Sequence, residues 1–383
     1  MPDGPRAVRP EEFESLMALI NTVFRSGKPP TMGEEYPHLF TPDNFENLRV
    51  IREYDVEGDA PSGIVSHVGT TIRDAVILGC HVRVGNVGAV STYPQHRQRG
   101  FASACFDDAC ANALRQGVDF MLISGDRSLY RRAGCRKVGR DSEFTVTRDI
   151  AAAQRGTVTV ERYQDANLYD VKRIYESEPV RYFRPLEEWQ RFLRDGASTH
   201  HRAELWVIRR GSDIVAYCAL YPKSSDGTSA FEEYAGDRTA LMGALDELMT
   251  QQDLNAVDVH VSSHDDLLRT LLRGCNAPAR HAHASGTQLI LNFPQFMERL
   301  RPLMEERVGT AEARRLSFRD YNGTFVFAYD GETVISTTRG GAAQVVWGTW
   351  EEREWQWAKE GRGKEVLSRV FPIPALWYGF SYV

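Results

Sequence analysis

Two arginines and a glycine stand in a short turn between residues 90 and 102, where an apolar run gives way to a helix-like pattern. The first N–H groups of a helix have no partner within it and the helix dipole makes that end positive, so it binds anions such as a diphosphate. Gly100 brings no Cβ between backbone and phosphate, and Arg97 and Arg99 add positive charge. We therefore predict a diphosphate site at the start of this helix, with Gly100, Arg97 and Arg99 around it.

Strands and helices predicted around this turn hold it in place. Apolar positions at helical spacing predict helices over residues 11–24 and 101–116, and the second presents one apolar face to a sheet. Short apolar runs separated by glycine predict an antiparallel meander over 48–92, and 120–123 is expected to form a short buried strand. An exposed basic turn that only caps a helix is the alternative, and the strand before and helix after the turn favour the anion site.

The run Arg97-Gln98-Arg99-Gly100-Phe101-Ala102 resembles the signature [QR]-x-x-G-x-[GA] of the GNAT N-acetyltransferases. The resemblance implies that these residues, with Ser103, hold the diphosphate of acetyl-CoA, the co-substrate. It also implies that the strand Val90, Ser91 and Thr92 pairs with the pantetheine arm. A backbone N–H of that strand would meet the oxyanion of the reaction. Residues 124–135 resemble a second GNAT pattern, which implies that Tyr130 protonates the departing thiolate; a tyrosine that only packs in the core is the alternative. The aromatic residue expected after Gly134 is Cys135 here.

The order of helix, meander, glycine-led helix and buried strand recurs weakly after about residue 157. With a small α+β segment at the end, the whole chain resembles the enhanced-intracellular-survival (Eis) acetyltransferases. The resemblance implies an α/β (α+β) fold of tandem GNAT domains with a small sterol-carrier-protein-like domain. We expect a catalytic GNAT domain at 1–150, a degenerate second GNAT domain at 151–292 and the third domain at 293–383. The turn at 231–237 is acidic, so only the first half should bind acetyl-CoA.

The same resemblance implies that the free carboxylate of the C-terminal residue, here Val383, enters the active site as the base. Many relatives end in an aromatic residue instead, but the apolar tail at 371–383 favours a packed chain end. The implied reaction is direct acetyl transfer to the primary amine of an aminoglycoside, amino sugar, polyamine or lysine side chain, in a homo-oligomer, which is a hexamer among relatives. The alternatives are an acyl-CoA-binding sensor or lipid carrier and a dedicated protein or peptide acetyltransferase.

Composition excludes several other classes. The chain has 383 residues, enough for more than one domain, and a net charge of −6, which disfavours binding to nucleic acid. No run of about 20 apolar residues and no apolar leader segment occurs, so we expect a cytoplasmic protein that does not enter membranes. The six cysteines form no CxxC pair and are interpreted as reduced core residues.

Histidine pairs and acidic residues are candidates for a metal site and for an amine pocket. The pairs His200/His201, His260/His264 and His281/His283 have no cysteine or carboxylate at the usual ligand spacings, so we expect no metal. Four acidic residues near the N-terminus are interpreted as solvated loop charge, with the lining of an amine pocket as the alternative. These residues are Glu34, Glu35, Asp43 and Glu46.

Overall fold

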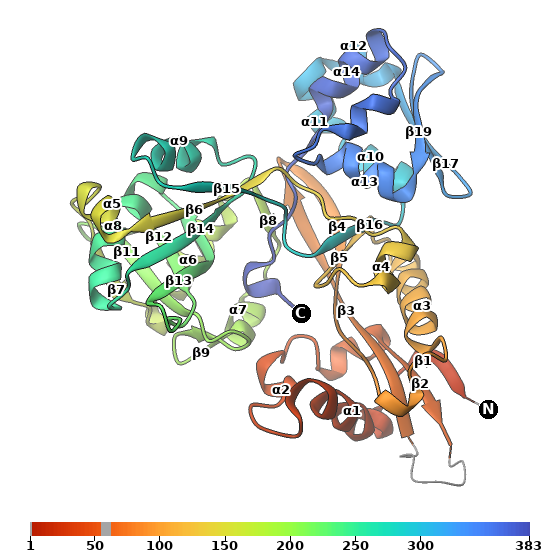
Figure 1. The fold of residues 1–383 in the computed structure, drawn as a ribbon, viewed down its shortest axis with the longest axis horizontal. Helices are drawn as coiled ribbons and strands as arrows, with labels where there is room; N and C mark the ends of the chain where they lie inside the picture. The colour runs from red at the N-terminus through yellow and green to blue at the C-terminus, as the bar shows by residue number, and fades with distance from the viewer. Residues whose placement is uncertain (1, 55–62) are drawn as a thin grey trace.

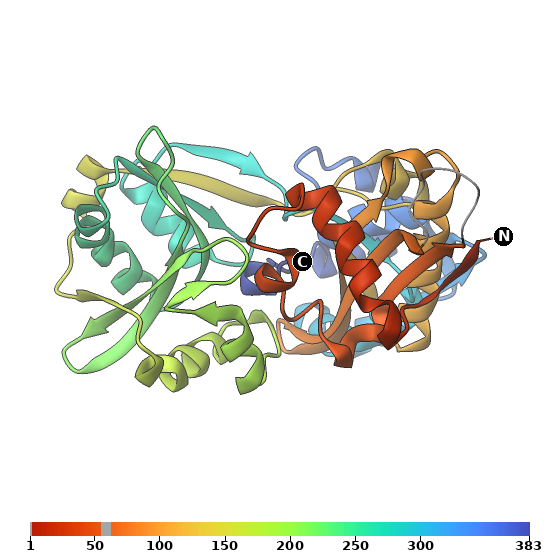
Figure 2. The same cartoon turned by 90° about the horizontal axis from the view of Figure 1, so that it is seen from below.

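The computed structural model describes residues 2–54 and 63–383. Within these ranges the strands form three sheets, of seven, nine and three strands. The two larger sheets form lobes that lie side by side, and the smallest sheet and its helices cover one end of the first lobe (Figure 1). The C-terminus lies between the two lobes, as Figure 2 also shows from below. None of the described helices is both long and apolar enough to cross a bilayer.

The first sheet is built around a long antiparallel hairpin, β3 and β4. The short runs expected over 48–92 join into these two long strands, and the part of the predicted meander at 55–62 lies outside the described residues. The order is β1-β2-β3-β4-β5-β16, with β8 added to β3. The bounds are β1 Asp3–Ala7, β2 Leu48–Glu53, β3 Gly63–Ile77, β4 Cys80–Thr92, β5 Phe120–Ile123, β8 Val180–Tyr182 and β16 Thr287–Ile290.

The two helices predicted in the first lobe, at 11–24 and 101–116, are confirmed as α1 and α3, with ends that differ by at most two residues. In α3 the predicted apolar face is buried, including Cys105, Phe106 and Ala109, which fixes the helix N-terminus relative to the sheet. The α-helices are α1 Phe13–Arg25, α2 Met32–Glu35, α3 Phe101–Arg115 and α4 Ser128–Ala133, and the 3-10 helices are η1 Pro10–Glu12, η2 Pro42–Asn47 and η3 Pro94–His96.

The second sheet has the order β15-β6-β14-β13-β12-β11-β10-β9, with β7 added to β11. Its strands are β6 Asp141–Thr147, β7 Thr159–Arg162, β9 Leu193–Arg194, β10 Ala197–Ser198, β11 Glu204–Arg210, β12 Asp213–Leu220, β13 Thr228–Gly236, β14 Ala256–Val261 and β15 Ala279–Ala282. The helices of this lobe are α5 Arg148–Ala153, η4 Asp165–Asn167, α6 Leu168–Glu176, α7 Leu186–Phe192, α8 Arg238–Gln251 and α9 Asp266–Gly274.

The third region is a three-stranded meander covered by helices. Two short turns join its strands: Asn322 and Gly323 join the first pair, Asp330 and Gly331 the second, and all four residues have positive φ. The strands are β17 Leu316–Tyr321, β18 Thr324–Tyr329 and β19 Glu332–Thr338. The helices are α10 Phe293–Arg299, α11 Arg301–Val308, α12 Thr310–Arg315, α13 Arg339–Trp347, η5 Arg353–Trp357, α14 Arg362–Val370 and, in the tail, η6 Gly379–Ser381.

The lobes exchange strands across the predicted domain limits. Strand β6 lies within 1–150 yet pairs with β14 of the second sheet, while β8 and β16 lie within 151–292 yet pair with β3 and β5 of the first sheet. Sheet membership therefore does not follow the chain in simple blocks. The domain limits at 150 and 292 stay predictions.

Candidate active site

The turn predicted to bind a diphosphate leaves the N-terminus of α3 open. Residues 93–100 connect β4 to this helix, and Gly100 ends the turn at φ 81°, in the left-handed region that glycine adopts readily. No side chain caps α3, and its first helical hydrogen bond is donated by Ala104 N–H to the carbonyl of Gly100 at 3.0 Å. The N–H groups ahead of that bond have no place in the helical pattern. They belong to Phe101, Ala102 and Ser103.

The two arginines of the turn differ in how their charges are used. Both oxygens of Glu53 accept hydrogen bonds from Arg99, at 2.6 and 2.7 Å, which holds the pKa of Glu53 below its usual value. The Arg99 guanidinium also lies 4.6 Å from the Phe101 ring centroid. Arg97 is exposed, donates to the carbonyl of Thr92 at 3.2 Å and has no acidic partner among the described residues. Arg97 is therefore the better placed of the two to meet a phosphate.

Strand β4 contains a β-bulge directly before this turn. Its register against β3 shifts between Gly88 and Ser91, and Ala89 in the shifted stretch has φ 52°. A bulge turns successive backbone groups away from the regular ladder. Val90 lies in this stretch, and Ser91 and Thr92 follow it as buried residues. The predicted contact between the Val90 strand and a thioester oxyanion stays a prediction, and the bulge provides an irregular backbone there.

Strands β4 and β5 part just before the bulge. They pair in parallel from Val84 to Val87 on β4, and the last pair is Val87 with Ile123. The N–H of Ser124 still donates to the carbonyl of Val87 at 3.2 Å, and no further pairing of the two strands occurs in the described chain. Beyond this point β4 has no strand partner on this side in the described chain, and its predicted pairing with a pantetheine arm stays a prediction.

Tyr130 lies in α4, beside the point where β4 and β5 part. Its ring centroid is 5.5 Å from that of Phe106, and a side chain at Gly125, just after β5, would press on the ring. Burial raises the pKa of Tyr130 to about 12, so the hydroxyl is protonated at neutral pH, as a proton donor must be. The sequence expectation used the ordinary pKa of about 10, and the shift makes Tyr130 a weaker acid by about 3 kcal/mol.

The carboxyl group of Val383 lies against β4 at the bulge. A Cβ on Gly88 would overlap the carboxyl carbon and oxygen of Val383, so only glycine leaves room for the chain end. Val383 is 4% exposed and packs in a cluster of apolar residues of the first lobe, which includes Leu39, Phe40 and Ala89. The expected packed tail is therefore observed, and its terminal carboxyl group lies beside the stretch of β4 predicted to bind acetyl-CoA.

A buried ion pair from the second lobe anchors this tail. Arg184 donates to both carboxylate oxygens of Glu233, at 2.8 and 2.7 Å, and both side chains are almost fully buried. Glu233 also accepts the backbone N–H of Phe380 at 3.1 Å, and Arg184 Nε lies 3.2 Å from the Ser381 hydroxyl oxygen. Because the pair bonds to the tail itself, its geometry sets where the last residues run.

Two side chains of the first lobe hold the tail from the other side. Asn86 of β4 donates to the carbonyl of Ser381 at 3.0 Å. Burial keeps the pKa of His38 well below its usual value, so its neutral ring donates from Nε2 to the carbonyl of Tyr382 at 2.9 Å. The chain end is thus held by both lobes within a few residues of Val383.

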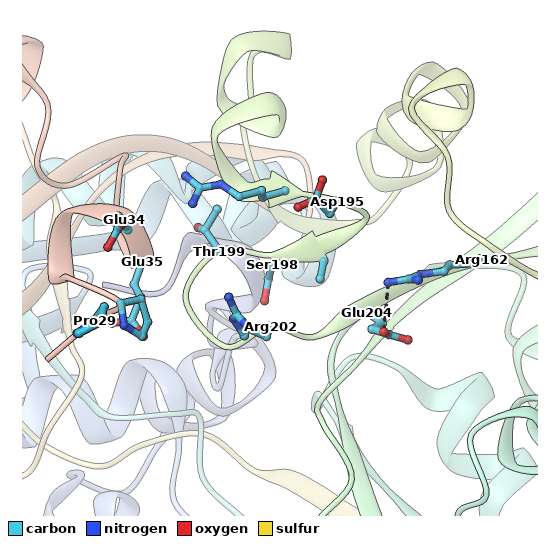
Figure 3. Close-up of a pocket in the computed structure, with 12 residues that line it drawn as sticks. Pro29, Glu34, Glu35, Arg162, Asp195, Ser198, Thr199, Arg202 and Glu204 are labelled. Atoms are coloured by element: carbon cyan, nitrogen blue, oxygen red, sulfur yellow. Dashed lines mark hydrogen bonds and ion pairs between the residues drawn. The ribbon is translucent and has the colours of Figure 1, made fainter. Parts of the chain in front are cut away.

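A cavity of about 660 Å³ opens between α2 and the hairpin of β9 and β10. Figure 3 shows Glu34 and Glu35 on one wall and Thr199 and Arg202 on the other. Glu34 and Glu35 both line this cavity, and Glu34 is exposed there, so their role in binding an amine stays a prediction. Positive side chains line it as well, so its charge is mixed.

Comparison with known proteins agrees with this geometry. Residues 5–138 match the family model of the acetyltransferase (GNAT) domain. The first lobe is a GNAT acetyltransferase domain. The match identifies the chain as an acetyltransferase enzyme and implies the use of acetyl-CoA. A search of curated proteins finds no match.

Solved structures extend the likeness to the whole chain. The GCN5-related N-acetyltransferase from Anabaena variabilis superimposes with a TM-score of 0.65 at 14% identity, covering 98% of this chain and 99% of that one. Eis1 from Mycobacterium abscessus gives 0.64 at 13% identity and covers 99% of both. A probable N-acyltransferase from Enterococcus faecalis gives 0.57 at 16% identity, covering 78% and 74%. At these identities the likeness shows the fold alone, a mixed α/β architecture consistent with tandem GNAT domains.

The residues that hold the C-terminal tail were missed by sequence reasoning. Arg184 and Glu233 are 49 residues apart, and each meets the tail more than 140 residues further along the chain, so no local pattern joins them. One signal was available at Gly88, since a glycine inside a strand marks a bulge or a close backbone approach. The structure shows both at that residue.

Proposed function

We propose that this chain is an acetyl-CoA-dependent N-acetyltransferase that acts on primary amines by direct transfer. One observation carries the proposal: the terminal carboxyl group of Val383 is inserted against the bulged strand β4, which leads into the uncapped N-terminus of α3. An anion site, a strand edge and a carboxylate base then meet in one place. In this proposal the diphosphate binds at Arg97 and the N–H groups of α3, and the pantetheine arm follows Val90 to Thr92.

Val383 supplies the base in this reaction. An alkylammonium with a pKa near 10.4 must lose a proton before it can attack, which costs about 4.6 kcal/mol at pH 7. An apolar enclosure makes a carboxylate a stronger base than it is in water, and Val383 is buried in a cluster of apolar residues. The free amine then attacks the thioester carbonyl, and the oxyanion that forms is met by a backbone N–H of the Val90 stretch.

Tyr130 supplies the acid. As the tetrahedral species collapses, the carbon–sulfur bond breaks and the thiolate leaves with the electron pair. A proton from the Tyr130 hydroxyl neutralises that thiolate, and the proton taken up by Val383 leaves to solvent or returns to the tyrosine. The burial that raises the pKa of Tyr130 to about 12 keeps this proton in place until charge develops on sulfur.

The acceptor enters through the cavity between α2 and the β9–β10 hairpin in this proposal. Glu34, Glu35 and Asp195 offer carboxylates to an ammonium, while Arg194 and Arg202 bring positive charge. This mixed lining suits a polar, polyfunctional amine, so aminoglycosides, amino sugars, polyamines and lysine side chains all remain acceptors to test. The proposal also includes a sterol-carrier-like third domain, a homo-oligomeric state and a cytoplasmic location, by resemblance.

The experiment is a thiol-release assay with acetyl-CoA and a panel of these amines. Wild-type protein should release CoA with at least one acceptor, and Tyr130→Phe should lower kcat about 100-fold with acetyl-CoA binding intact. Adding one alanine after Val383, or Gly88→Ala, should displace the carboxylate and lower kcat by a similar factor. Gly85→Ala is the matched control on β4, because its Cβ meets only side-chain atoms at 3.3 Å or more and should leave turnover within about twofold.

One outcome would overturn the proposal, and another would remove one residue from its mechanism. Tight acetyl-CoA binding with no release of CoA with any amine would favour a sensor or carrier. Full activity after the one-residue extension would remove Val383 as the base and leave the acetyltransferase assignment standing without it.

A further inference from the structure

Three side chains able to bind a metal meet beneath the C-terminal segment, and the proposed reaction uses none of them. His200 and His201 lie between β10 and β11, and Glu232 lies in β13. Nε2 of His200 is 2.6 Å from Oε1 of Glu232, and Nδ1 of His201 is 3.0 Å from the same oxygen. Across residues 2–54 and 63–383, no other three metal-ligating side chains converge in this way.

Polar atoms of this cluster are buried without enough partners. His200 is 5% exposed and Glu232 is 2% exposed. Three atoms of the cluster form no hydrogen bond with any described residue: both ring nitrogens of His200 and Oε2 of Glu232. This holds even though His200 Nε2 lies close to Glu232 Oε1. A buried polar atom without a partner loses its hydration and gains no hydrogen bond in return, so the cluster is costly as it stands. Only His201 Nδ1 and Glu232 Oε1 form a hydrogen bond within the cluster, which leaves the other three atoms for a further ligand.

We propose that His200, His201 and Glu232 bind a divalent transition-metal ion of the Zn²⁺ class. Two imidazole nitrogens and one carboxylate oxygen suit zinc, cobalt or nickel better than magnesium or calcium, which prefer oxygen ligands alone. Bonds of about 2.0–2.2 Å to zinc place neighbouring ligand atoms roughly 3 Å or more apart. The present separations of 2.6 and 3.0 Å therefore need only a small widening.

The position of the cluster gives an entry path for the ion. The His201 side chain is 32% exposed. The loop that carries it also contributes Thr199 and Arg202 to the cavity wall in Figure 3. Three protein ligands leave a fourth position open to water or to a group from that cavity.

The same position couples the ion to the chain end. The Tyr382 ring lies nearly parallel to that of His200, at 11° with centroids 6.0 Å apart, and 5.0 Å from that of His201. An ion that ties His200 and His201 to Glu232 stiffens the surface on which Tyr382 packs, next to the carboxyl group of Val383. Metal binding is therefore expected to stabilise the tail.

The test is a titration of the chelator-treated full chain with Co²⁺ and with Zn²⁺. Co²⁺ bound by nitrogen and oxygen ligands in a four-coordinate site absorbs strongly in the visible, so one equivalent should produce a saturable band that Zn²⁺ then displaces. Calorimetry should give one Zn²⁺ per chain. Thermal unfolding should shift upward with free Zn²⁺, as expected for a ligand that binds only the folded state.

Substitutions of the ligands give the matched comparison. His200→Ala and Glu232→Gln should each weaken Co²⁺ binding by more than about 100-fold, and His201→Asn, at the exposed ligand, covers the case in which a buried variant does not fold. His260→Gln is the control, because His260 also contacts a carboxylate, Asp141 at 3.0 Å, and lacks a third ligand. Absence of a saturable visible band in the wild type, or equal Co²⁺ affinity in the ligand variants and the control, overturns the proposal.

Discussion

Helices α3 and α8 occupy matching places in the two lobes, yet their N-termini differ. Each follows a strand and precedes a second strand parallel to the first. Residues 93–100 lead into α3, which has no side-chain cap, whereas Asp237 alone leads into α8 and accepts the N–H of Ala240 at 2.9 Å. A helix that supplies its own carboxylate has its anion site filled. Of these two helices, α3 is the one whose N-terminus has no side-chain cap.

The gap between the parallel strands differs in the same way. In the first lobe β4 and β5 part beside the predicted pantetheine site. In the second lobe β13 and β14 pair only as far as Ala230 and then part, and Trp377 of the tail packs against Tyr234 on one strand and His260 on the other. The second lobe thus holds the chain end in the gap between its parallel strands. The comparison shows that the same strand-helix-strand arrangement can leave its gap open in one lobe and fill it with the tail in the other.

The first prediction removes the anchor that the second lobe provides. Arg184→Met leaves the carboxylate of Glu233 buried and unpaired, which should lower the free energy of unfolding by about 3–5 kcal/mol in urea titration. Adding Glu233→Gln should regain part of this loss. Arg280→Met is the control, since Arg280 is 73% exposed in its pair with Glu143 and should cost less than about 1 kcal/mol. Equal losses in Arg184→Met and the control would mean that the anchor contributes little.

The second prediction gives α3 the cap that α8 already has. In Gly100→Asp the new carboxylate competes for the N–H groups at the helix start and repels the diphosphate. Because each charge-assisted hydrogen bond is worth about 1.5–3 kcal/mol, acetyl-CoA binding should weaken by roughly 4 kcal/mol, or about 1000-fold, in calorimetry. Aspartate tolerates the left-handed backbone at this position better than most residues, so the fold should persist.

Its control is the reverse change in the second lobe. Asp237→Gly opens the N-terminus of α8, but the tail still occupies the adjoining groove, so the stoichiometry of acetyl-CoA should stay at one. If Gly100→Asp binds acetyl-CoA within tenfold of wild type, the diphosphate lies elsewhere. A second equivalent bound by Asp237→Gly would show that the cap alone had closed that site.

Sequence reasoning was sufficient where the pattern is local. The helix expected at 101–116 is α3, the strand expected at 120–123 is β5, and Gly100 stands between strand and helix as predicted. These elements were predictable because apolar periodicity and a turn glycine are signals between residues close together in the chain. The exchange of β6, β8 and β16 between lobes has no such signal. Pairing of β16 with β5 joins residues far apart in the chain, and an apolar run does not reveal which sheet it enters.

The convergence of His200, His201 and Glu232 also has no local signal in the sequence. The expectation of no metal rested on the lack of a carboxylate near His200 and His201 in sequence. Glu232 is 31 residues beyond His201, and the folding of β11, β12 and β13 into adjacent strands brings it back. Spacing rules find ligands that one turn or hairpin presents, and they miss ligands that a sheet assembles.

The third prediction concerns the residue before the second parallel strand of each lobe. Asp119 precedes β5, and Asn255 precedes β14. Asp119 accepts a hydrogen bond from Arg83 N–H at 2.7 Å. The Asn255 side chain donates to the carbonyl of Asp226 at 2.9 Å. Asp119 is fully buried, and burial raises its pKa from 3.8 to about 6. The charged form is therefore disfavoured in the fold, whereas Asn255 carries no charge.

Asp119→Asn makes the first lobe like the second and should remove a pH dependence. Because the pKa of Asp119 is higher in the folded state than in the unfolded state, the stability that Asp119 contributes is fully present below pH 4 and is lost as the pH rises through 6. The rise of the pKa from 3.8 to about 6 corresponds to a loss of about 3 kcal/mol by pH 7. The variant keeps a carbonyl oxygen for Arg83 N–H, so its gain over wild type should grow from near zero at pH 4 to about 3 kcal/mol at pH 7 in urea titrations. Asp226→Asn is the control, because the pKa of Asp226, about 2, lies below this window and its profile should follow wild type between pH 5 and 8. A gain that does not change with pH would show that Asp119 stays ionised in the fold, paired with Arg299, whose Nε lies 3.2 Å from it.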